Sequence, residues 1–360
     1  MSNITQKVTF FYKNIHEKQI FDTIAEELKK KKIIYNYSKN FEKKAQIGFY
    51  CNIPNKINSE ISAIFLGGMD QGRVIWPNIW KKEPWNKFDL GFLPGNNWEK
   101  RWRKSNYDNR SLTKYGVFNV GWPKADILFS KKKNEKDIIN FKKKYKIQSK
   151  KINILYAPSF ECFNRQVEVA KAVKKNGYNL IIKHWLEKDE KRYKDLWQTI
   201  KEVNIETLKI YKNKTIIINP EENFLKLLEF VDLIITDESS VAYEALIKMI
   251  PTISVKDWKI KRHNKATARI VKPSDIVIKC TKRTLSKKIQ EIIKNKKYSK
   301  QKLKNLRFQE FSFLGNSSKI VVQIMVDFLK NKDSIKRSKY LCKPNTKKFF
   351  LNKIKNFFKI

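Results

Sequence analysis

A run of polar residues, Thr236-Asp237-Glu238-Ser239-Ser240, directly follows the apolar stretch Leu233-Ile234-Ile235. The pattern predicts a buried strand over Asp232–Thr236 and then a helix over Val241–Met249, which Pro251 closes before the next strand. In an open parallel sheet, ligands bind outside the carboxyl ends of the strands. A helix start there offers unpaired N–H groups and the positive end of the helix dipole to an anion. The spacing therefore predicts a phosphate site, while ordinary capping by Asp and Ser explains one or two of these residues.

A second polar pair, Lys183-His184, ends the predicted strand Asn179–Lys183. A histidine at that edge of the sheet can act as a general base or donate a hydrogen bond to a phosphate. An isolated histidine is more often structural, so both roles stay open. The neighbouring predicted strand ends in Tyr156-Ala157-Pro158-Ser159, which would line the same ligand cleft.

Two further segments follow predicted strands in the first half of the chain. The turn Gly67-Gly68-Met69-Asp70-Gln71-Gly72 has glycines that permit close approach of a ligand to the backbone, and Asp70 is its only acid. Gly121-Trp122-Pro123-Lys124-Ala125-Asp126 ends the last strand of this half and would also face the cleft.

Short apolar strands alternate with amphipathic helices along most of the chain, which predicts parallel sheets with helices on both faces. Expected strands of the first half are Lys7–Tyr12, Ile33–Tyr37, Gln46–Cys51, Ala63–Leu66, Asp89–Leu93 and Val117–Gly121. Those of the second half are Ile152–Ala157, Asn179–Lys183, Thr215–Ile218, Asp232–Thr236 and Thr252–Val255. Expected helices are Glu17–Lys32, Arg165–Asn176, Glu187–Asn204, Glu221–Phe230 and Val241–Met249. We expect a first domain at residues 1–130, a basic linker at 131–151, a second domain at 152–330 and a basic tail at 331–360.

Charge and composition limit the classes of molecule that the protein can bind. Lysine and arginine total 78 against 35 acidic residues, giving a net charge of +43. Such a charge attracts nucleic acid, anionic lipid or anionic substrates, but a general bias towards Lys, Asn and Ile produces the same number without a functional meaning. No nucleic-acid-binding motif is recognisable, so nucleic acid is an unlikely partner. The apolar runs are too short to cross a bilayer, and the N-terminus has no signal-peptide core. Together with 4 scattered cysteines, these features predict a cytoplasmic protein with reduced thiols.

The last residues form a separate feature. Phe349-Phe350-Leu351, Ile354 and Phe357-Phe358 recur at helical spacing among lysines. A basic amphipathic helix of this kind can attach the chain peripherally to an anionic membrane surface, or it can pack against the protein body. Both interpretations stay open.

Taken together, these motifs resemble the CDP-glycerol glycerophosphotransferase family, whose members build polymers of the teichoic-acid type. The resemblance rests on three strand ends, Tyr156-Ala157-Pro158-Ser159, Lys183-His184-Trp185 and Thr236-Asp237-Glu238-Ser239-Ser240 with its helix and Pro251. Two further segments are similar to family motifs, Gly121-Trp122-Pro123-Lys124-Ala125-Asp126 and Phe313-Leu314-Gly315-Asn316-Ser317-Ser318. The likeness covers about residues 60–325 and is most specific from Tyr156 to Val255.

The resemblance implies an α/β protein of the GT-B type, in which two Rossmann-like domains with parallel sheets face a cleft. It implies His184 and, at the position of a missing family histidine, Asp70 as catalytic residues. The implied donor-phosphate residues are Thr236, Asp237, Ser239, Ser240, Ser159 and Lys183. The implied cleft lining is Tyr156, Pro158, Gly121, Trp122, Pro123, Glu238, Gly315 and Ser317, with Gly67 and Gly68 as an acceptor-side turn.

The expected activity is transfer of glycerol phosphate, or a related group, from a CDP-activated donor to a cell-surface polymer or a lipid-linked precursor. Neither a cofactor nor a metal is expected. A nucleotide-sugar glycosyltransferase of the same fold is one alternative. An inactive transferase or a non-enzymatic polyanion-binding protein is another, because the Gly67-Gly68 turn lacks the family's histidine and the charge is high.

Overall fold

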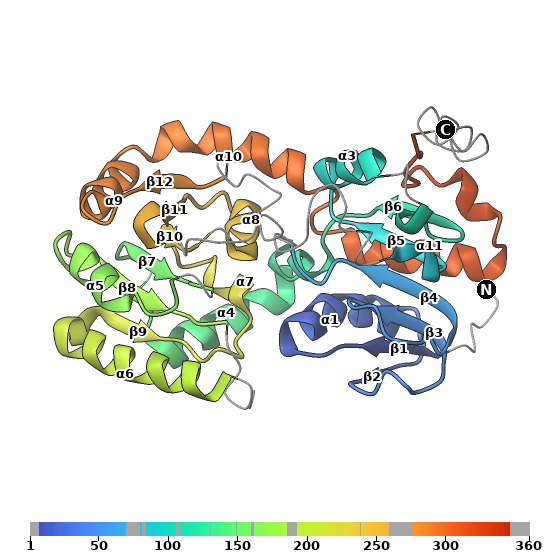
Figure 1. Ribbon diagram of the computed structural model, residues 1–360, viewed down its shortest axis with the longest axis horizontal. Coiled ribbons are helices and arrows are strands. Elements are labelled where there is room, and N and C mark those ends of the chain that lie inside the picture. Colours follow the sequence, from blue (N-terminus) through green and yellow to red (C-terminus); the bar gives the residue numbers. More distant parts are fainter. Residues whose placement is uncertain are drawn as a thin grey trace, which may run out of the picture. The chain divides into compact units, whose positions relative to one another are not determined.

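The computed structural model describes residues 7–69, 80, 84–105, 109–129, 131–148, 150–159, 162–185, 193–237, 239–258 and 276–345, without the side chains of 131–134 and 296–299. Within these residues the chain forms two compact units. The first contains the described residues up to 129 together with 308–345, and the second contains those from 131 to 307. Each unit has its own sheet and its own core (Figure 1).

The first unit is built on a six-stranded parallel sheet with the order β2-β1-β3-β4-β5-β6. Its strands are β1 (Val8–Phe11), β2 (Tyr35–Ser38), β3 (Ala45–Tyr50), β4 (Ser59–Phe65), β5 (Leu90–Leu93) and β6 (Gly116–Asn119). The helices are α1 (Ile15–Lys30), α3 (Asn96–Ser105) and α11 (Ser317–Lys330). Helix α1 starts at an N-cap, Asn14, whose side chain accepts a hydrogen bond from the N–H of Glu17. The core is rich in aromatic rings, such as the stacked pair Phe11 and Tyr50 with centroids 4.7 Å apart.

The second unit holds a six-stranded parallel sheet with the order β12-β11-β10-β7-β8-β9. Its strands are β7 (Asn153–Tyr156), β8 (Asn179–Ile182), β9 (Thr215–Ile217), β10 (Leu233–Ile235), β11 (Thr252–Val255) and β12 (Ile278–Cys280). Its helices are α4 (Lys131–Tyr145), α5 (Gln166–Lys174), α6 (Lys194–Tyr211), α7 (Phe224–Leu227), α8 (Ser240–Ile247), α9 (Leu285–Lys294) and α10 (Lys296–Glu310). Isoleucine, leucine and valine dominate this core, and the central strands are buried on both faces.

The two sheets confirm the α/β, GT-B-like fold class that the sequence predicts. Every expected strand is present, and β12 is an additional strand that the sequence analysis missed. Helix α6 (Lys194–Tyr211) continues beyond the predicted end at Asn204, so that end was wrong, while the predicted start at Glu187 lies outside the described residues. None of the described helices combines the length and apolar character needed to cross a bilayer.

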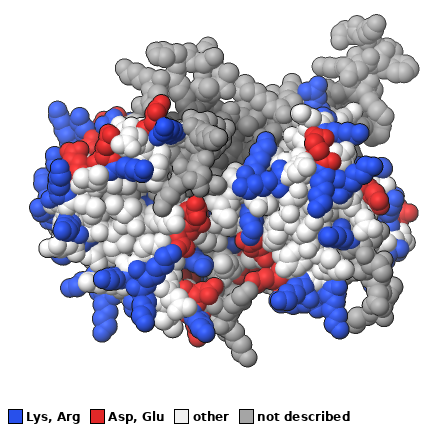
Figure 2. Space-filling model, turned by 90° about the horizontal axis from the view of Figure 1, so that it is seen from below, with Lys and Arg blue, Asp and Glu red and all other residues white. Residues whose placement is uncertain are grey.

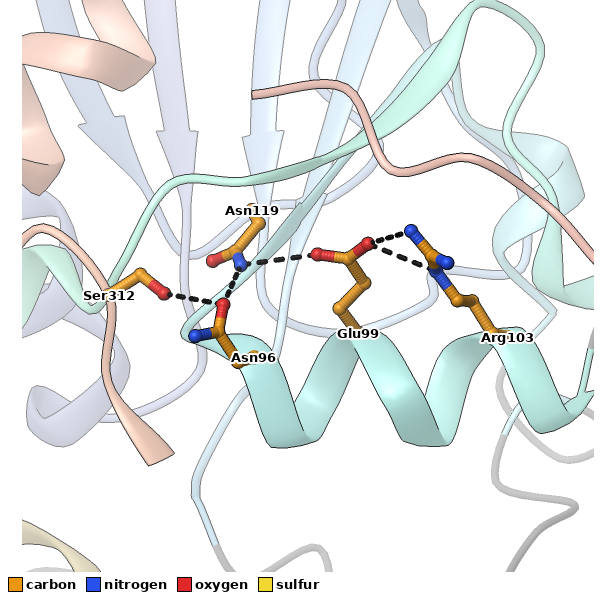
Figure 3. Close-up of polar contacts among 5 residues, drawn as sticks. All are labelled: Asn96, Glu99, Arg103, Asn119 and Ser312. Atoms are coloured by element: carbon orange, nitrogen blue, oxygen red, sulfur yellow. Dashed lines mark hydrogen bonds and ion pairs between the residues drawn. The ribbon is translucent and has the colours of Figure 1, made fainter. Parts of the chain in front are cut away.

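The chain returns to the first unit at Phe308, in the last turn of α10, which differs from the expected second domain at 152–330. The returning segment is held by Glu310, which pairs with Arg101 of α3 at 3.3 Å and accepts a hydrogen bond from Asn97 at 2.7 Å. Next to it, Ser312 donates to Asn96 Oδ1, which also accepts from Asn119 at the end of β6 (Figure 3). These polar contacts attach Glu310 and Ser312 to α3 of the first unit.

The segment before the predicted tail is also part of the first unit. Leu341 forms an antiparallel bridge with Phe118 of β6, and the N–H of Cys342 donates to the carbonyl of Val117 at 2.8 Å. Residues 338–342 therefore cover the outer edge of this sheet, an edge that would otherwise be open to pairing with another chain. The tail residues 346–360 lie outside the described part of the structure.

Lysine and arginine side chains are dispersed rather than gathered. On the face shown in Figure 2 they lie singly or in small groups among uncharged residues, with acidic groups between them. This distribution favours a general compositional bias as the source of much of the +43 charge.

Candidate functional site: the β7/β10 switch point

The order of the second sheet places one ligand-binding position at its centre. Strand β7 pairs with β10 on one side and β8 on the other, with Ile154 opposite Leu233 and Leu180. From β7 the chain continues outwards through β8 and β9, and later from β10 through β11 and β12. The carboxyl ends of β7 and β10 thus form the topological switch point, where open α/β sheets bind their ligands.

Asp237 connects the two strand ends at this point. Its Oδ2 accepts hydrogen bonds from the backbone N–H of Ser159 at 3.0 Å and from the Ser159 hydroxyl at 2.5 Å. The side chain is buried, with a relative exposure of 4% for the residue. Asp237 thus accepts both hydrogen bonds of Ser159 and positions that residue at the end of β7.

The hydroxyl groups of Thr236 and Ser239 also form hydrogen bonds within the protein. Thr236 Oγ1 donates to the carbonyl of Ala157 at 2.5 Å, since a carbonyl oxygen can only accept. The single hydroxyl proton of Thr236 is then occupied, so in the 3.2 Å contact between Thr236 Oγ1 and Ser239 Oγ it is Ser239 that donates. Both hydroxyls, like that of Ser159, consolidate the turn in this structure.

The start of α8 remains as the anion-binding element. Ser239 is its N-cap residue in an extended conformation, and the Ser239 side chain makes no capping hydrogen bond. Ser240, the first helical residue, is half-buried. The first-turn N–H groups of a helix point away from its body and their dipoles favour a negative charge, although in α8 the N–H of Ala242 already donates to the Ser239 carbonyl at 3.1 Å. Ser240 and these amides can therefore hold a phosphate, while Glu238 lies outside the described residues.

His184 follows β8 and is buried, with a relative exposure of 2%. Its Nε2 lies 3.1 Å from the side-chain amide nitrogen of Gln166, which also donates to Asn204 Oδ1 at 3.3 Å. Within the described residues Nδ1 is buried without a hydrogen-bond partner. Burial and, to a lesser extent, the charge of Lys183 lower the pKa of His184 from 6.5 to about 4, against a small opposing effect of Asn204. The imidazole is therefore neutral at pH 7.

Three other residues predicted to contact the donor have structural partners. Lys183 is buried and its ammonium donates to the carbonyls of Pro220 at 2.8 Å and His184 at 3.3 Å. Tyr156 is fully buried, with its hydroxyl donating to the Cys162 carbonyl, and Pro158 is buried beside it. These contacts shape the ends of β7 and β8.

The predicted lining segments of the first unit form a cap on helix α11. The carboxylate of Asp126 accepts hydrogen bonds from the N–H groups of Gly315 at 2.9 Å, Ser317 at 3.3 Å and Ser318 at 2.6 Å. Burial raises the pKa of Asp126, and the three N–H donors oppose that shift. The family-like segments around Gly121 and Gly315 thus meet each other within the first unit.

Close packing accounts for the other residues of these segments. Gly121 has φ +92°, and a Cβ there would overlap the carbonyl oxygen of Ser312 and the hydroxyl of Ser317. Trp122 is buried and the Pro123 carbonyl accepts a hydrogen bond from Thr23 at 2.8 Å. A cap of this kind holds α11 against the unit to which the chain has returned.

The predicted acceptor-side turn lies at the carboxyl end of β4. Gly67 directly follows Phe65-Leu66, and a Cβ on it would lie 3.0 Å from the carbonyl oxygen of Cys51 after β3. Gly68 is the next residue of this turn, whereas Asp70, the predicted base, lies outside the described residues.

Gln166 and Asn204 are site residues that the sequence analysis missed. Both are buried amides on helices, at the start of α5 and within α6. A polar residue on the apolar face of an amphipathic helix is a signal that could have identified them, because buried amides require partners.

Comparison with known proteins places these features in context. A model of the CDP-glycerol:poly(glycerophosphate) glycerophosphotransferase family matches residues 97–327, more than half of the chain. The structure is similar to that of the wall teichoic acid polymerase TagF, with TM-score 0.61, 14% identity and coverage of 91% of this chain and 90% of that one.

A TagF variant soaked with CDPG gives TM-score 0.64 at 15% identity, covering 91% and 90% of the two chains. The UDP-GlcNAc 2-epimerase of Neisseria meningitidis bound to UDP-GlcNAc gives 0.55 at 14% identity, covering 90% and 100%. At these identities the likeness concerns the fold. No curated protein matches the sequence.

Proposed function

Because the chain belongs to the CDP-glycerol:poly(glycerophosphate) glycerophosphotransferase family, we propose that it transfers glycerol phosphate from CDP-glycerol to a hydroxyl group of a cell-surface polymer or its lipid-linked precursor. The acceptor oxygen forms a bond to the phosphorus of the glycerol phosphate. The bond from that phosphorus to the CMP oxygen breaks, and CMP leaves with the electron pair. The acceptor proton passes to a base, for which Asp70 is the proposed residue.

The start of α8 at the carboxyl end of β10, beside the end of β7, carries this proposal. Its N–H groups and Ser240 would hold the donor pyrophosphate and stabilise the charge that grows on CMP as it leaves. Asp237, Thr236 and Ser239 would act indirectly, by fixing the turn before α8. His184, neutral and next to this strand edge, would contribute a hydrogen bond rather than a positive charge.

Release of CMP from CDP-glycerol, with a lipid-linked glycerol phosphate primer as acceptor, tests the assignment. We expect Ser240→Ala to lower kcat/KM by about tenfold or more, the usual effect of removing one donor to a developing charge. Ser334→Ala, which removes an exposed hydroxyl of the first unit that donates to the carbonyls of Asp327 and Asn331, is the matched control and should keep full activity.

Parallel assays with CDP-ribitol and nucleotide sugars decide between the donors. Turnover of nucleotide sugars alone would replace the proposal with a glycosyltransferase. Binding of CDP-glycerol without release of CMP, in the presence of a suitable primer, would favour an inactive member of the family. Asp70→Asn separates chemistry from binding, since loss of the base should abolish CMP release and leave donor binding intact.

A further inference from the structure

Residues 330–360 have no part in the proposed transfer, and their charge exceeds what the general bias of the chain explains. They include 11 lysine and arginine residues and one acid, Asp333, which gives a net charge of +10. Fewer than a tenth of the 360 residues thus supply more than a fifth of the net charge of +43. Composition alone therefore does not account for this segment.

Residues 340–342 fix the point at which the segment leaves the first unit. The N–H of Asn119 donates to the carbonyl of Tyr340 at 2.8 Å, and the N–H of Cys342 donates to the carbonyl of Val117 at 2.8 Å. The segment therefore runs antiparallel to β6, from the carboxyl end of that strand towards its amino end. Open α/β sheets bind their ligands at the carboxyl ends of the strands. The chain after Cys342 thus starts at the opposite edge of this sheet.

Three lysines lie at this amino end of β6. Tyr115 directly precedes the strand, and the ammonium groups of Lys114 and Lys332 lie over its ring, 5.1 and 5.6 Å from the centroid. The third, Lys343, directly follows the last residue paired with β6. Lys332 and Lys343 are exposed, while the side chain of Lys114 is 66% exposed and lies 4.0 Å from Asp89. Lys114, Lys332 and Lys343 are called the basic corner below.

The chain continues from the basic corner into residues 346–360, whose sequence combines positive charge with apolar side chains. Five of these residues are lysines and none is acidic. Lysines attract anionic headgroups, and apolar side chains insert at the boundary between headgroups and acyl chains. A single-stranded nucleic acid would gain from stacking on the phenylalanines, but Leu351, Ile354 and Ile360 offer its bases no ring to stack on. The sequence therefore favours a lipid surface over a nucleic acid.

We propose that the basic corner and residues 346–360 together bind the surface of an anionic phospholipid bilayer. The corner supplies exposed charge at a fixed place on the first unit, and residues 346–360 supply further charge and the apolar side chains. Attachment through this edge leaves the carboxyl ends of the first sheet accessible to a ligand. The inference is independent of the proposed function, because it concerns neither the donor nor the transfer.

Co-sedimentation of the full chain with lipid vesicles tests the proposal. One set of vesicles contains phosphatidylglycerol and phosphatidylcholine in equal parts, and the other contains phosphatidylcholine alone. We expect binding to the anionic vesicles that weakens as the salt concentration rises, and much weaker binding to the neutral ones. No binding to the anionic vesicles, or equal binding to both sets, would overturn the proposal.

Charge variants locate the surface. Replacing both Lys332 and Lys343 by glutamine should weaken binding to the anionic vesicles about tenfold, since each lysine near such a surface contributes to binding. The control pair Lys194→Gln and Lys209→Gln removes the same charge from exposed positions on α6 and should have little effect. Asp333→Asn removes the one acid of the segment and should strengthen binding about fivefold. Equal losses in the two lysine pairs would mean that net charge alone attracts the vesicles, and would overturn the proposal.

An apolar variant separates insertion from attraction by charge. Phe350→Ser should weaken vesicle binding about tenfold, because it removes an apolar side chain from the lipid boundary. Phe308→Ser, at a residue of α10 that is 74% exposed, should leave binding unchanged. Circular dichroism checks that each variant is folded. Tighter binding of single-stranded RNA than of the anionic vesicles, lost when Lys332 and Lys343 are replaced, would assign this surface to nucleic acid and reject the proposal.

Discussion

Acidification should destabilise the second unit through protonation of His184. The pKa of His184 is about 4 in the folded protein against 6.5 in an unfolded chain. Between these values the unfolded state binds a proton that the folded state refuses, so stability is lost as the pH falls through this window and is complete above it. Linkage over this window gives a loss of about 2 kcal/mol between pH 7.5 and pH 5, and about 3 kcal/mol by pH 4.

Urea unfolding followed by circular dichroism at half-unit pH steps measures this effect. Groups other than His184 titrate equally in wild type and in His184→Gln, so the difference between the two unfolding free energies isolates the histidine. That difference should change by about 2 kcal/mol between pH 7.5 and pH 5, with the wild type losing more. His16→Gln, in the first unit, should leave the His184 contribution in place. Parallel curves for wild type and His184→Gln, with a change below about 0.5 kcal/mol, would mean that His184 protonates freely and would refute its burial as a neutral ring.

Two further predictions concern the scaffold of the site. Gly121→Ala should destabilise the first unit by about 3 kcal/mol or more in thermal unfolding, because φ is +92° and the added methyl group would overlap the Ser312 carbonyl. The control Gly177→Ala, at φ +69° with nothing within 4 Å of its Cβ, should cost about 1 kcal/mol. Asp237→Ala should cost about 3 kcal/mol and weaken donor binding, because the part-buried N–H and hydroxyl of Ser159 lose their acceptor. Asp257→Ala, which removes an exposed acceptor for the N–H of Lys282, should cost less than about 1 kcal/mol, and equal losses for the two aspartates would contradict the argument.

Strand positions were predictable from sequence because parallel strands buried on both faces are continuous apolar runs. Leu233-Ile234-Ile235 is such a run, and β10 occupies those residues. β12 is short, and a charged residue, Lys279, interrupts its apolar residues, so no run marks it. The end of α6 was missed because lysine and glutamate are common on both sides of Asn204, so composition there does not mark an end.

The same error concealed part of the site. A helix ending at Asn204 would leave that residue at a frayed terminus, whereas α6 continues to Tyr211 and places Asn204 in its buried middle. Asn204, which belongs to the hydrogen-bond network beside His184, can be recognised only from the packing of α5 against α6. Local sequence carries no information on that contact.

The sequence identified the residues at the strand ends, but it did not show which of them would contact a phosphate and which would hold the turn. Residue types alone made Thr236, Asp237 and Ser239 equal candidates for binding a phosphate. Their actual roles depend on which protons are already donated, and that depends on contacts such as Ser159 with Asp237, 78 residues apart in sequence. Sheet order brings these residues together, and sheet order follows from the crossovers rather than from any local pattern.

The use of these protons narrows how the site can stabilise a phosphate. Three hydroxyls of the turn donate to protein atoms, Lys183 donates to carbonyls, and His184 is neutral at pH 7. The donors that this strand edge offers to a phosphate are then backbone amides at the start of α8. None of these changes its charge between pH 6 and pH 8, so binding of the donor by this unit should be nearly independent of pH over that range. A steep pH dependence of donor binding would require a titrating group that the β7/β10 switch point does not supply, and would locate the dominant phosphate contact elsewhere in the chain.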